Sequence, residues 1–186
     1  MGRVYLITGG VRSGKSTCAV ERAMKYEDRA YIATAVVEDD EMRERVRKHQ
    51  AEREGKFTTY ETNDDLPRLI HESRHQVILL DCVSNLVSSL MRVIPDYEMA
   101  SISERECVEK DILAYIDEIA QAAIASASDV IFVTNELGQG MAPLYALGRQ
   151  FRDTVGRANQ ILACAADEVY LMICGLPVTL KGDRPD

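Results

Sequence analysis

An eight-residue stretch near the start of the chain, GGVRSGKS at positions 9–16, constrains the fold more than any other feature. It matches the pattern G-x-x-x-x-G-K-[S/T], in which glycines let backbone N–H groups turn inward around an anion. A β-rich apolar run, Arg3–Thr8, precedes the stretch, and a helical pattern, Lys15–Tyr26, follows it. A strand, a glycine-rich turn and a helix in this order form a P-loop, so we expect an α/β fold built around it.

The residue types in this stretch suit a phosphate ligand. The backbone N–H groups and the positive end of the following helix both attract phosphate oxygens. Lys15 would reach the β- and γ-phosphates of a nucleotide, and the Ser16 hydroxyl would ligate Mg²⁺. A glycine-rich turn with a chance lysine is the alternative interpretation, which the flanking strand and helix disfavour. We therefore predict nucleotide contacts from eight consecutive residues: Gly9, Gly10, Val11, Arg12, Ser13, Gly14, Lys15 and Ser16.

Downstream of this turn, strand-like and helix-like segments alternate. Short apolar runs predict strands at 29–33, 77–80, 130–133 and 168–173, and helical spacing predicts helices at 39–52, 64–73, 83–91, 103–126 and 146–166. A last short segment, 178–180, follows a glycine and a proline that break the chain. Ser103 and Glu106 match the capping box of the longest helix. The alternation predicts one three-layer α/β domain over residues 1–186, with a mostly parallel sheet.

The composition excludes several other classes of protein. Apolar residues make up 46% and charged residues 28% of the 186 residues, which suits a packed core rather than disorder. The net charge of −8 argues against a nucleic-acid binder. The first apolar run, Val4–Ile7, is too short for a signal peptide or a membrane-spanning helix, so we expect no membrane insertion. The five cysteines are widely spaced and form no C-x-x-C pair, which favours a reducing cytoplasm.

Two acidic residues follow apolar strands, at the sheet edge where the ligands of α/β folds collect. Asp81 ends the run VILLD, and Glu136 comes shortly after the run VIFV. P-loop proteins commonly hold Mg²⁺ with a second acidic residue in such a position, which favours Asp81 as a metal ligand beside Ser16. Capping of the helix that begins near Val83 is the alternative role of Asp81, and the role of Glu136 stays open. The P-loop alone does not distinguish a kinase, an ATPase and a nucleotide switch.

A histidine lies within the basic stretch RERVRKHQAER at positions 43–53. Residues four apart share one face of a helix, so Arg45, His49 and Arg53 would form a stripe that holds a phosphate between two guanidinium groups. A neutral imidazole is a competent nucleophile toward phosphorus. The alternative is a solvated helix face with i,i+4 ion pairs, and the spacing alone favours this alternative.

Taken together, these motifs give the chain a family resemblance. It resembles the bifunctional adenosylcobinamide kinase / adenosylcobinamide-phosphate guanylyltransferase family of cobalamin biosynthesis. The resemblance covers nearly the whole chain and is carried by the segments TGGVRSGKS, YIATA, DDEMRERVRKHQAER, FTTYE, ILLDC, TNELGQGMAP and GRQFRDTVGRANQILACAADEVYLMICGLPVTLK. The first segment is shared with many families, whereas the histidine-bearing segment and FRDTVGRANQ are much more specific.

The resemblance implies a P-loop α/β domain that assembles as a homotrimer. It implies phosphorylation of the aminopropanol hydroxyl of adenosylcobinamide by ATP or GTP, with Lys15 acting on the phosphates. GMP is then transferred from GTP to the new phosphate through a guanylylated histidine, which matches His49, with release of pyrophosphate. The resemblance also places nucleotide contacts outside the P-loop, at Thr34, Ala35, Val36, Gln50, Ala51, Glu52, Arg53, Glu61 and Asp81.

The residue chemistry is consistent with these implied roles. Attack by His49 on the α-phosphorus would form a phosphoramidate and split one hard step into two. Glu61 would accept hydrogen bonds from the N–H groups of guanine, since a carboxylate takes two donors from that edge. Two alternatives remain open from the residues alone: a kinase for a small molecule without guanylyl transfer, and a nucleotide switch without catalysis.

Overall fold

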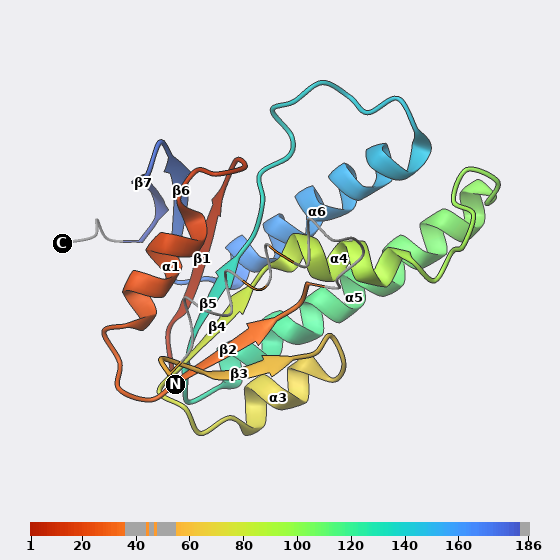
Figure 1. The fold of residues 1–186 in the computed structure, drawn as a ribbon. Coiled ribbons are helices and arrows are strands. Elements are labelled where there is room, and N and C mark those ends of the chain that lie inside the picture. Colours follow the sequence, from red (N-terminus) through yellow and green to blue (C-terminus); the bar gives the residue numbers. More distant parts are fainter. Residues whose placement is uncertain (36–43, 45–46, 48–54, 183–186) are drawn as a thin grey trace.

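A seven-stranded sheet forms the centre of the computed structural model, which describes residues 1–35, 44, 47 and 55–182 (Figure 1). The strands are β1 (Val4–Gly9), β2 (Arg29–Ala33), β3 (Thr58–Glu61), β4 (Val77–Asp81), β5 (Asp129–Val133), β6 (Glu168–Ile173) and β7 (Leu176–Lys181). Their order across the sheet is β3-β2-β4-β5-β1-β6-β7. All neighbouring pairs are parallel except β6 and β7, which form an antiparallel hairpin. The predicted α/β fold with a mostly parallel sheet is confirmed.

Helices cover both faces of this sheet (Figure 1). They are α1 (Lys15–Ala23), α3 (Leu66–Glu72), α4 (Val83–Met91), α5 (Ile102–Ala125) and α6 (Ala146–Ala165). Successive side chains of a strand point to opposite faces, so Val4 and Leu6 of β1 pack with α3 to α6, whereas Tyr5 and Ile7 pack with α1. The result is a three-layer arrangement. None of the helices in the described part of the chain has the length and apolarity needed to cross a membrane.

Two local features differ from the sequence prediction. The strand β3 was not predicted, because it is a short edge strand whose residues are mostly exposed and carry no apolar alternation. The capping box of α5 is formed by Ser101 and Glu104, so the prediction of Ser103 and Glu106 is wrong. The pattern S-x-x-E occurs twice in overlapping registers, and Ile102 is already helical, which places Ser103 inside the first turn. Of the predicted helix at 39–52, residues 44 and 47 alone belong to the described part of the chain, and both are helical.

Candidate nucleotide site

Residues 9–16 run from the last residue of β1, through the predicted loop, to the first two residues of α1. Gly9 and Gly14 have φ angles of +154° and +97°, which residues with side chains rarely adopt. A Cβ atom at Gly9 would lie 2.6 Å from the backbone oxygen of Met172 and 2.7 Å from Ser13 Oγ. The close approach of β6 and the backbone angle therefore both require glycine at position 9.

The interior of this loop has the character of an anion cradle. The Lys15 side chain is buried, and its Nζ donates to the Gly10 carbonyl oxygen at 2.6 Å, so its charge lies inside the loop. Two buried hydroxyl oxygens of this part of the chain, Thr8 Oγ1 and Ser13 Oγ, find no hydrogen-bond partner among the described residues. A buried hydroxyl without a partner costs about 1–3 kcal/mol. Phosphate oxygens would accept from both hydroxyls, so these groups fit a phosphate ligand.

The turn between β6 and β7 supports the loop from the other side. The Gly175 N–H donates to the Ser13 carbonyl oxygen at 3.0 Å. A Cβ atom at Gly14 would lie only 3.2 Å from Gly175 Cα, so the two backbones are in direct contact. The sequence predicted a chain break near Gly175 but gave no sign of this contact, because it joins residues that are far apart in the chain.

Three of the predicted site residues lie at one edge of the sheet. Asp81 of β4 and Glu61 of β3 are the register partners of Ala33, on either side of β2. At a strand spacing of about 4.8 Å, the Cα atoms of Asp81 and Glu61 are roughly 10 Å apart. Thr34 follows directly after Ala33 and is 1% exposed. This edge is also where β1 ends in the P-loop, since all these strands run parallel.

Asp81 is held by a neighbouring strand and not by the helix that follows it. Its Oδ2 accepts a hydrogen bond of 2.8 Å from the Tyr31 hydroxyl. The N-cap of α4 is Cys82, and no side chain caps this helix, so the capping role of Asp81 is not supported. Burial, and then the Asp81 charge, raise the pKa of the Cys82 thiol to about 11, and the Lys15 charge opposes this shift. The charges of Asp81 and Lys15 are thus both close enough to the Cys82 thiol to affect its pKa.

Asp81 and Ser16 fit the chemistry of a Mg²⁺ site. Mg²⁺ is usually bound by one or two carboxylates together with water and substrate phosphates, not by a complete protein cage. The residues that the structure describes contain no group of three or more His, Cys, Asp or Glu side chains that could hold a metal ion by themselves. The half-buried Asp81 and the partly exposed Ser16, at the start of α1, belong to the same edge of the sheet.

The Thr34 side chain links the end of β2 to the end of β4 by hydrogen bonds. Its Oγ1 donates to the Cys82 carbonyl oxygen at 2.7 Å and accepts from the Cys82 N–H at 3.0 Å. The hydroxyl is therefore engaged and buried, and it holds the end of β2 against the end of β4. Val36, Arg45, His49, Gln50, Ala51, Glu52 and Arg53 lie outside the described residues.

The end of β5 carries polar contacts that the sequence prediction missed. The Thr134 hydroxyl donates to Asn159 Oδ1 at 2.7 Å, and Asn135 Nδ2 donates to Ser84 Oγ at 2.7 Å. Asn159 in turn donates to the Asn135 carbonyl oxygen at 3.0 Å. The polar pair Thr-Asn directly after an apolar strand was a usable signal, because α/β folds collect their ligands at that edge. These contacts anchor the β5 end to α4 and α6.

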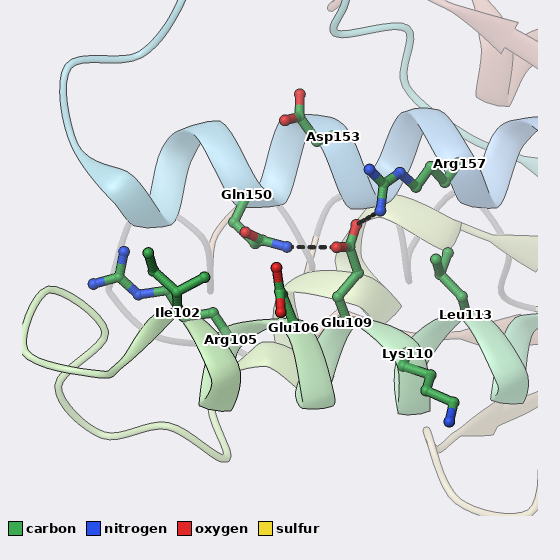
Figure 2. Close-up of a pocket in the computed structure, with 9 residues that line it drawn as sticks. All are labelled: Ile102, Arg105, Glu106, Glu109, Lys110, Leu113, Gln150, Asp153 and Arg157. Atoms are coloured by element: carbon green, nitrogen blue, oxygen red, sulfur yellow. Dashed lines mark hydrogen bonds and ion pairs between the residues drawn. The ribbon is translucent and has the colours of Figure 1, made fainter.

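A separate hollow lies between the first halves of α5 and α6 (Figure 2). It has a volume of about 620 Å³ and is lined by Ile102, Arg105, Glu106, Glu109, Lys110, Leu113, Gln150, Asp153 and Arg157. Glu109 is buried at its floor and accepts from Gln150 Nε2 at 2.8 Å and from Arg157 at 3.0 Å. These bonds join α5 to α6, and no described residue that we predict to bind nucleotide lines this hollow.

Comparison with known proteins assigns the chain to a family. The model of the family described as "Cobinamide kinase / cobinamide phosphate guanyltransferase" matches residues 5–180. The chain belongs to this family. It is 37% identical over 180 residues to the Bifunctional adenosylcobalamin biosynthesis protein CobU of Escherichia coli K12, an alignment that covers 96% of this chain and 99% of the relative. It is 36% identical, with the same coverage, to the protein of that name from Salmonella typhimurium LT2.

A more distant member has a different name. The Bifunctional adenosylcobalamin biosynthesis protein CobP of Pseudomonas aeruginosa PAO1 is 32% identical over 182 residues, which cover 96% of this chain and 97% of that protein. Membership of the cobinamide kinase / cobinamide phosphate guanyltransferase family makes the chain a kinase and nucleotidyltransferase of cobalamin biosynthesis. The matched range contains the P-loop, Thr34, Glu61 and Asp81, so the edge of the sheet described above lies within the family's common region.

Proposed function

We propose that the P-loop edge of the sheet carries two successive reactions on cobinamide. In the first, the hydroxyl of the aminopropanol arm of adenosylcobinamide takes the γ-phosphoryl group of ATP or GTP. In the second, GMP passes from GTP to the new phosphate and pyrophosphate leaves. The observation that carries the proposal is the cradle of Gly9 to Ser16, with a buried lysine and the unpartnered hydroxyls of Thr8, just before it, and Ser13, in a chain of this family.

Residues of the cradle have distinct roles in the first reaction. The inward-facing N–H groups and the start of α1 orient the phosphates. Lys15 places its ammonium beside the phosphate oxygens, where negative charge grows as the terminal phosphoryl group leaves. We propose that Ser16 and Asp81 hold Mg²⁺, which when bound supplies further positive charge to the phosphates.

The second reaction needs a nucleophile that attacks the α-phosphorus, and we assign this role to His49. Its imidazole nitrogen would form a bond to phosphorus while the bond to the pyrophosphate oxygen breaks, which gives a phosphoramidate. The cobinamide phosphate would then take GMP from the histidine. We further propose that Glu61 accepts from guanine and that backbone groups of Thr34, Ala35 and Val36, with residues 50–53, contact the nucleotide. Support for these assignments comes from the match of the motifs to the family.

The covalent step gives a direct test of the proposal. Protein treated with GTP and Mg²⁺ and analysed by mass spectrometry should carry one GMP on His49. The adduct should be stable in base and labile in acid, as expected of a phosphoramidate. The variant His49→Ala should take up no label from α-labelled GTP, yet should still phosphorylate cobinamide with ATP. Equal labelling of the variant would overturn the role of His49, and cobinamide-dependent use of ATP without any adduct would identify a kinase alone.

We infer that the protein works as a homo-oligomer, a trimer, in the cytoplasm. Family resemblance supports the trimer, and exposed apolar side chains near the start of α6 support an assembly of some kind. Met141 and Leu144 are 96% and 90% exposed, and Tyr145 is 68% exposed. All five cysteines are free, which suits a reducing compartment. Light scattering would test the trimer, since a monomeric mass at micromolar concentration would contradict it.

A further inference from the structure

We propose that Glu136 is the general base of the kinase reaction, the group that takes the proton from the attacking cobinamide hydroxyl. The inference rests on the proposed function, because it names a residue for the first of the two reactions. It concerns a carboxylate that comes three residues after β5, at the same edge of the sheet as the P-loop.

The position of β5 places this carboxylate next to the phosphates. In the sheet, β5 lies between β1, which leads into the P-loop, and β4, which ends in Asp81. The backbone N–H of Glu136 donates to the Gly9 carbonyl oxygen at 2.9 Å. Gly10, the next residue of the loop, accepts from Lys15 Nζ. In Figure 1 the chain beyond β5 accordingly rises beside the turn that follows β1. Glu136 is thus joined to the part of the loop where Lys15 meets the terminal phosphate.

The side chain is held in place on one oxygen only. Glu136 Oε1 accepts from the Gly138 N–H at 2.6 Å. Within the described part of the chain, Oε2 accepts no hydrogen bond, and the residue is half-buried. A Cβ atom at position 138 would lie 2.8 Å from Oε1, so the glycine there leaves room beside the carboxylate. One oxygen therefore fixes the group and the other is available to a substrate hydroxyl.

Two other described carboxylates at this edge are less suited to the task. Asp81 accepts from the Tyr31 hydroxyl and is the candidate metal ligand. Glu61 ends β3, which is separated from β1 by β2, β4 and β5, so it lies too far across the sheet from the P-loop. Among the described carboxylates of this edge, Glu136 is the one bonded through its backbone to the P-loop itself. The anchoring of Thr134 and Asn135 further fixes the chain that carries it.

The step balances with the groups named. The hydroxyl oxygen forms a bond to the γ-phosphorus as the bond from that phosphorus to the bridging oxygen breaks. The electron pair of the broken bond leaves on ADP. The hydroxyl proton passes to the Glu136 carboxylate and from there to water, which restores the carboxylate for the next turnover. A base positioned in this way contributes a factor on the order of 10²–10⁴ in rate.

The test separates the two reactions in the variant Glu136→Gln. The amide keeps an oxygen that accepts from Gly138, so the turn is preserved, but it takes up no proton. Phosphorylation of cobinamide with ATP and Mg²⁺ should fall in kcat by a factor on the order of 10²–10⁴, with KM for ATP unchanged. GMP transfer from GTP to cobinamide phosphate prepared beforehand should keep its wild-type rate. The matched control is Gln139→Ala, an exposed position on the same segment, which should leave both rates unchanged.

Each contrary outcome has a distinct meaning. A kinase rate in Glu136→Gln close to that of the wild type would overturn the role of Glu136. Equal loss of both reactions would show that the residue supports the P-loop, and recovery of the kinase rate at raised Mg²⁺ would show that it holds the metal. Either result also overturns the proposal. If the wild-type protein itself fails to phosphorylate cobinamide, the proposed function fails instead, so the two failures are distinguishable.

Discussion

At Gly9, a backbone angle and two neighbouring atoms act together to exclude any side chain. Its φ is +154°, and a Cβ atom would meet the Met172 backbone oxygen and Ser13 Oγ at less than 3 Å. Both neighbours belong to the structure that shapes the cradle, since β6 pairs with β1 and Ser13 lies inside the loop. A substitution here must therefore displace either a strand or the loop.

We predict that Gly9→Ala lowers the free energy of unfolding by about 1–3 kcal/mol, the usual range for overpacking at a filled site. It should also weaken nucleotide binding, because the loop would move away from β6. Urea unfolding and titration with GTP would measure the two effects. Gly10→Ala is the matched stability control, because a Cβ atom there meets nothing within 4 Å. Equal losses of stability in both variants would contradict this account.

Among the elements, α5 has a start that is defined by reciprocal hydrogen bonds. The Ser101 N–H donates to Glu104 Oε2 at 2.8 Å, and the Glu104 N–H donates to Ser101 Oγ at 3.2 Å. The bonds from Ser101 lower the pKa of the Glu104 carboxyl, since they favour its charged form. The same S-x-x-E pattern at Ser103 makes no cap, because that residue is already in the helix.

We predict that Ser101→Ala lowers the free energy of unfolding by about 1 kcal/mol, the usual cost of a lost N-cap. Ser103→Ala should be neutral or slightly stabilising, since alanine is the better helix former inside a helix. Thermal or urea unfolding of the two variants side by side would decide the register of the cap. A larger loss from Ser103→Ala than from Ser101→Ala would contradict the structure.

The elements also show which parts of the fold are readable from the sequence. Long periodic segments and buried strands were predicted within three residues of their observed ends. Their burial requires apolar residues at helical spacing or in continuous runs, and these patterns can be recognised in the sequence. The strand Thr58–Glu61 was missed because its side chains are mostly exposed.

In the candidate site, the P-loop and Asp81 were predictable from local motifs. The contacts Gly175 with Ser13, Tyr31 with Asp81, and Glu136 with Gly9 were not, because each depends on how distant segments pack.

For the molecule as a whole, one buried carboxylate links α5 to α6 in addition to the apolar core that the two helices share. Glu109 is 7% exposed and accepts a hydrogen bond from Thr154. It also accepts a hydrogen bond from Gln150 and forms an ion pair with Arg157 (Figure 2). Removal of a buried acceptor leaves its donors without partners, which costs about 1–3 kcal/mol. The exposed Glu106 lines the same hollow without such bonds to α6 among the described residues.

We predict that Glu109→Ala lowers the free energy of unfolding by about 1–3 kcal/mol, while Glu106→Ala changes it by less than about 0.5 kcal/mol, as is usual for surface substitutions. Chemical unfolding would measure both. Arg157→Ala should cost less than about 1 kcal/mol, because its side chain is 59% exposed and solvent screens the pair. If Glu109→Ala were as mild as Glu106→Ala, the buried network would not hold the two helices together.

Tyr170 joins three parts of the molecule on the other side of the sheet. Its ring lies in β6, its hydroxyl donates to Glu168, and it accepts from Arg22 of α1 at 2.9 Å. Glu168 also forms an ion pair of 3.1 Å with Arg3, ahead of β1. The start of the chain, the helix after the P-loop and β6 therefore meet around one phenol that is 1% exposed.

This phenol makes the stability of the whole molecule depend on pH in the alkaline range. Burial, and then the hydrogen bond to Glu168, raise the pKa of Tyr170 from 10.0 to about 12. Between these values the unfolded chain loses the proton while the folded chain keeps it, so stability falls as pH rises from about 10 to about 12. The variant Tyr170→Phe should show a shallower fall over this range in urea midpoints. Tyr145→Phe, at a position 68% exposed, should keep the wild-type slope. An unchanged slope in Tyr170→Phe would contradict the prediction, because the phenol would then not be the group that couples proton loss to unfolding.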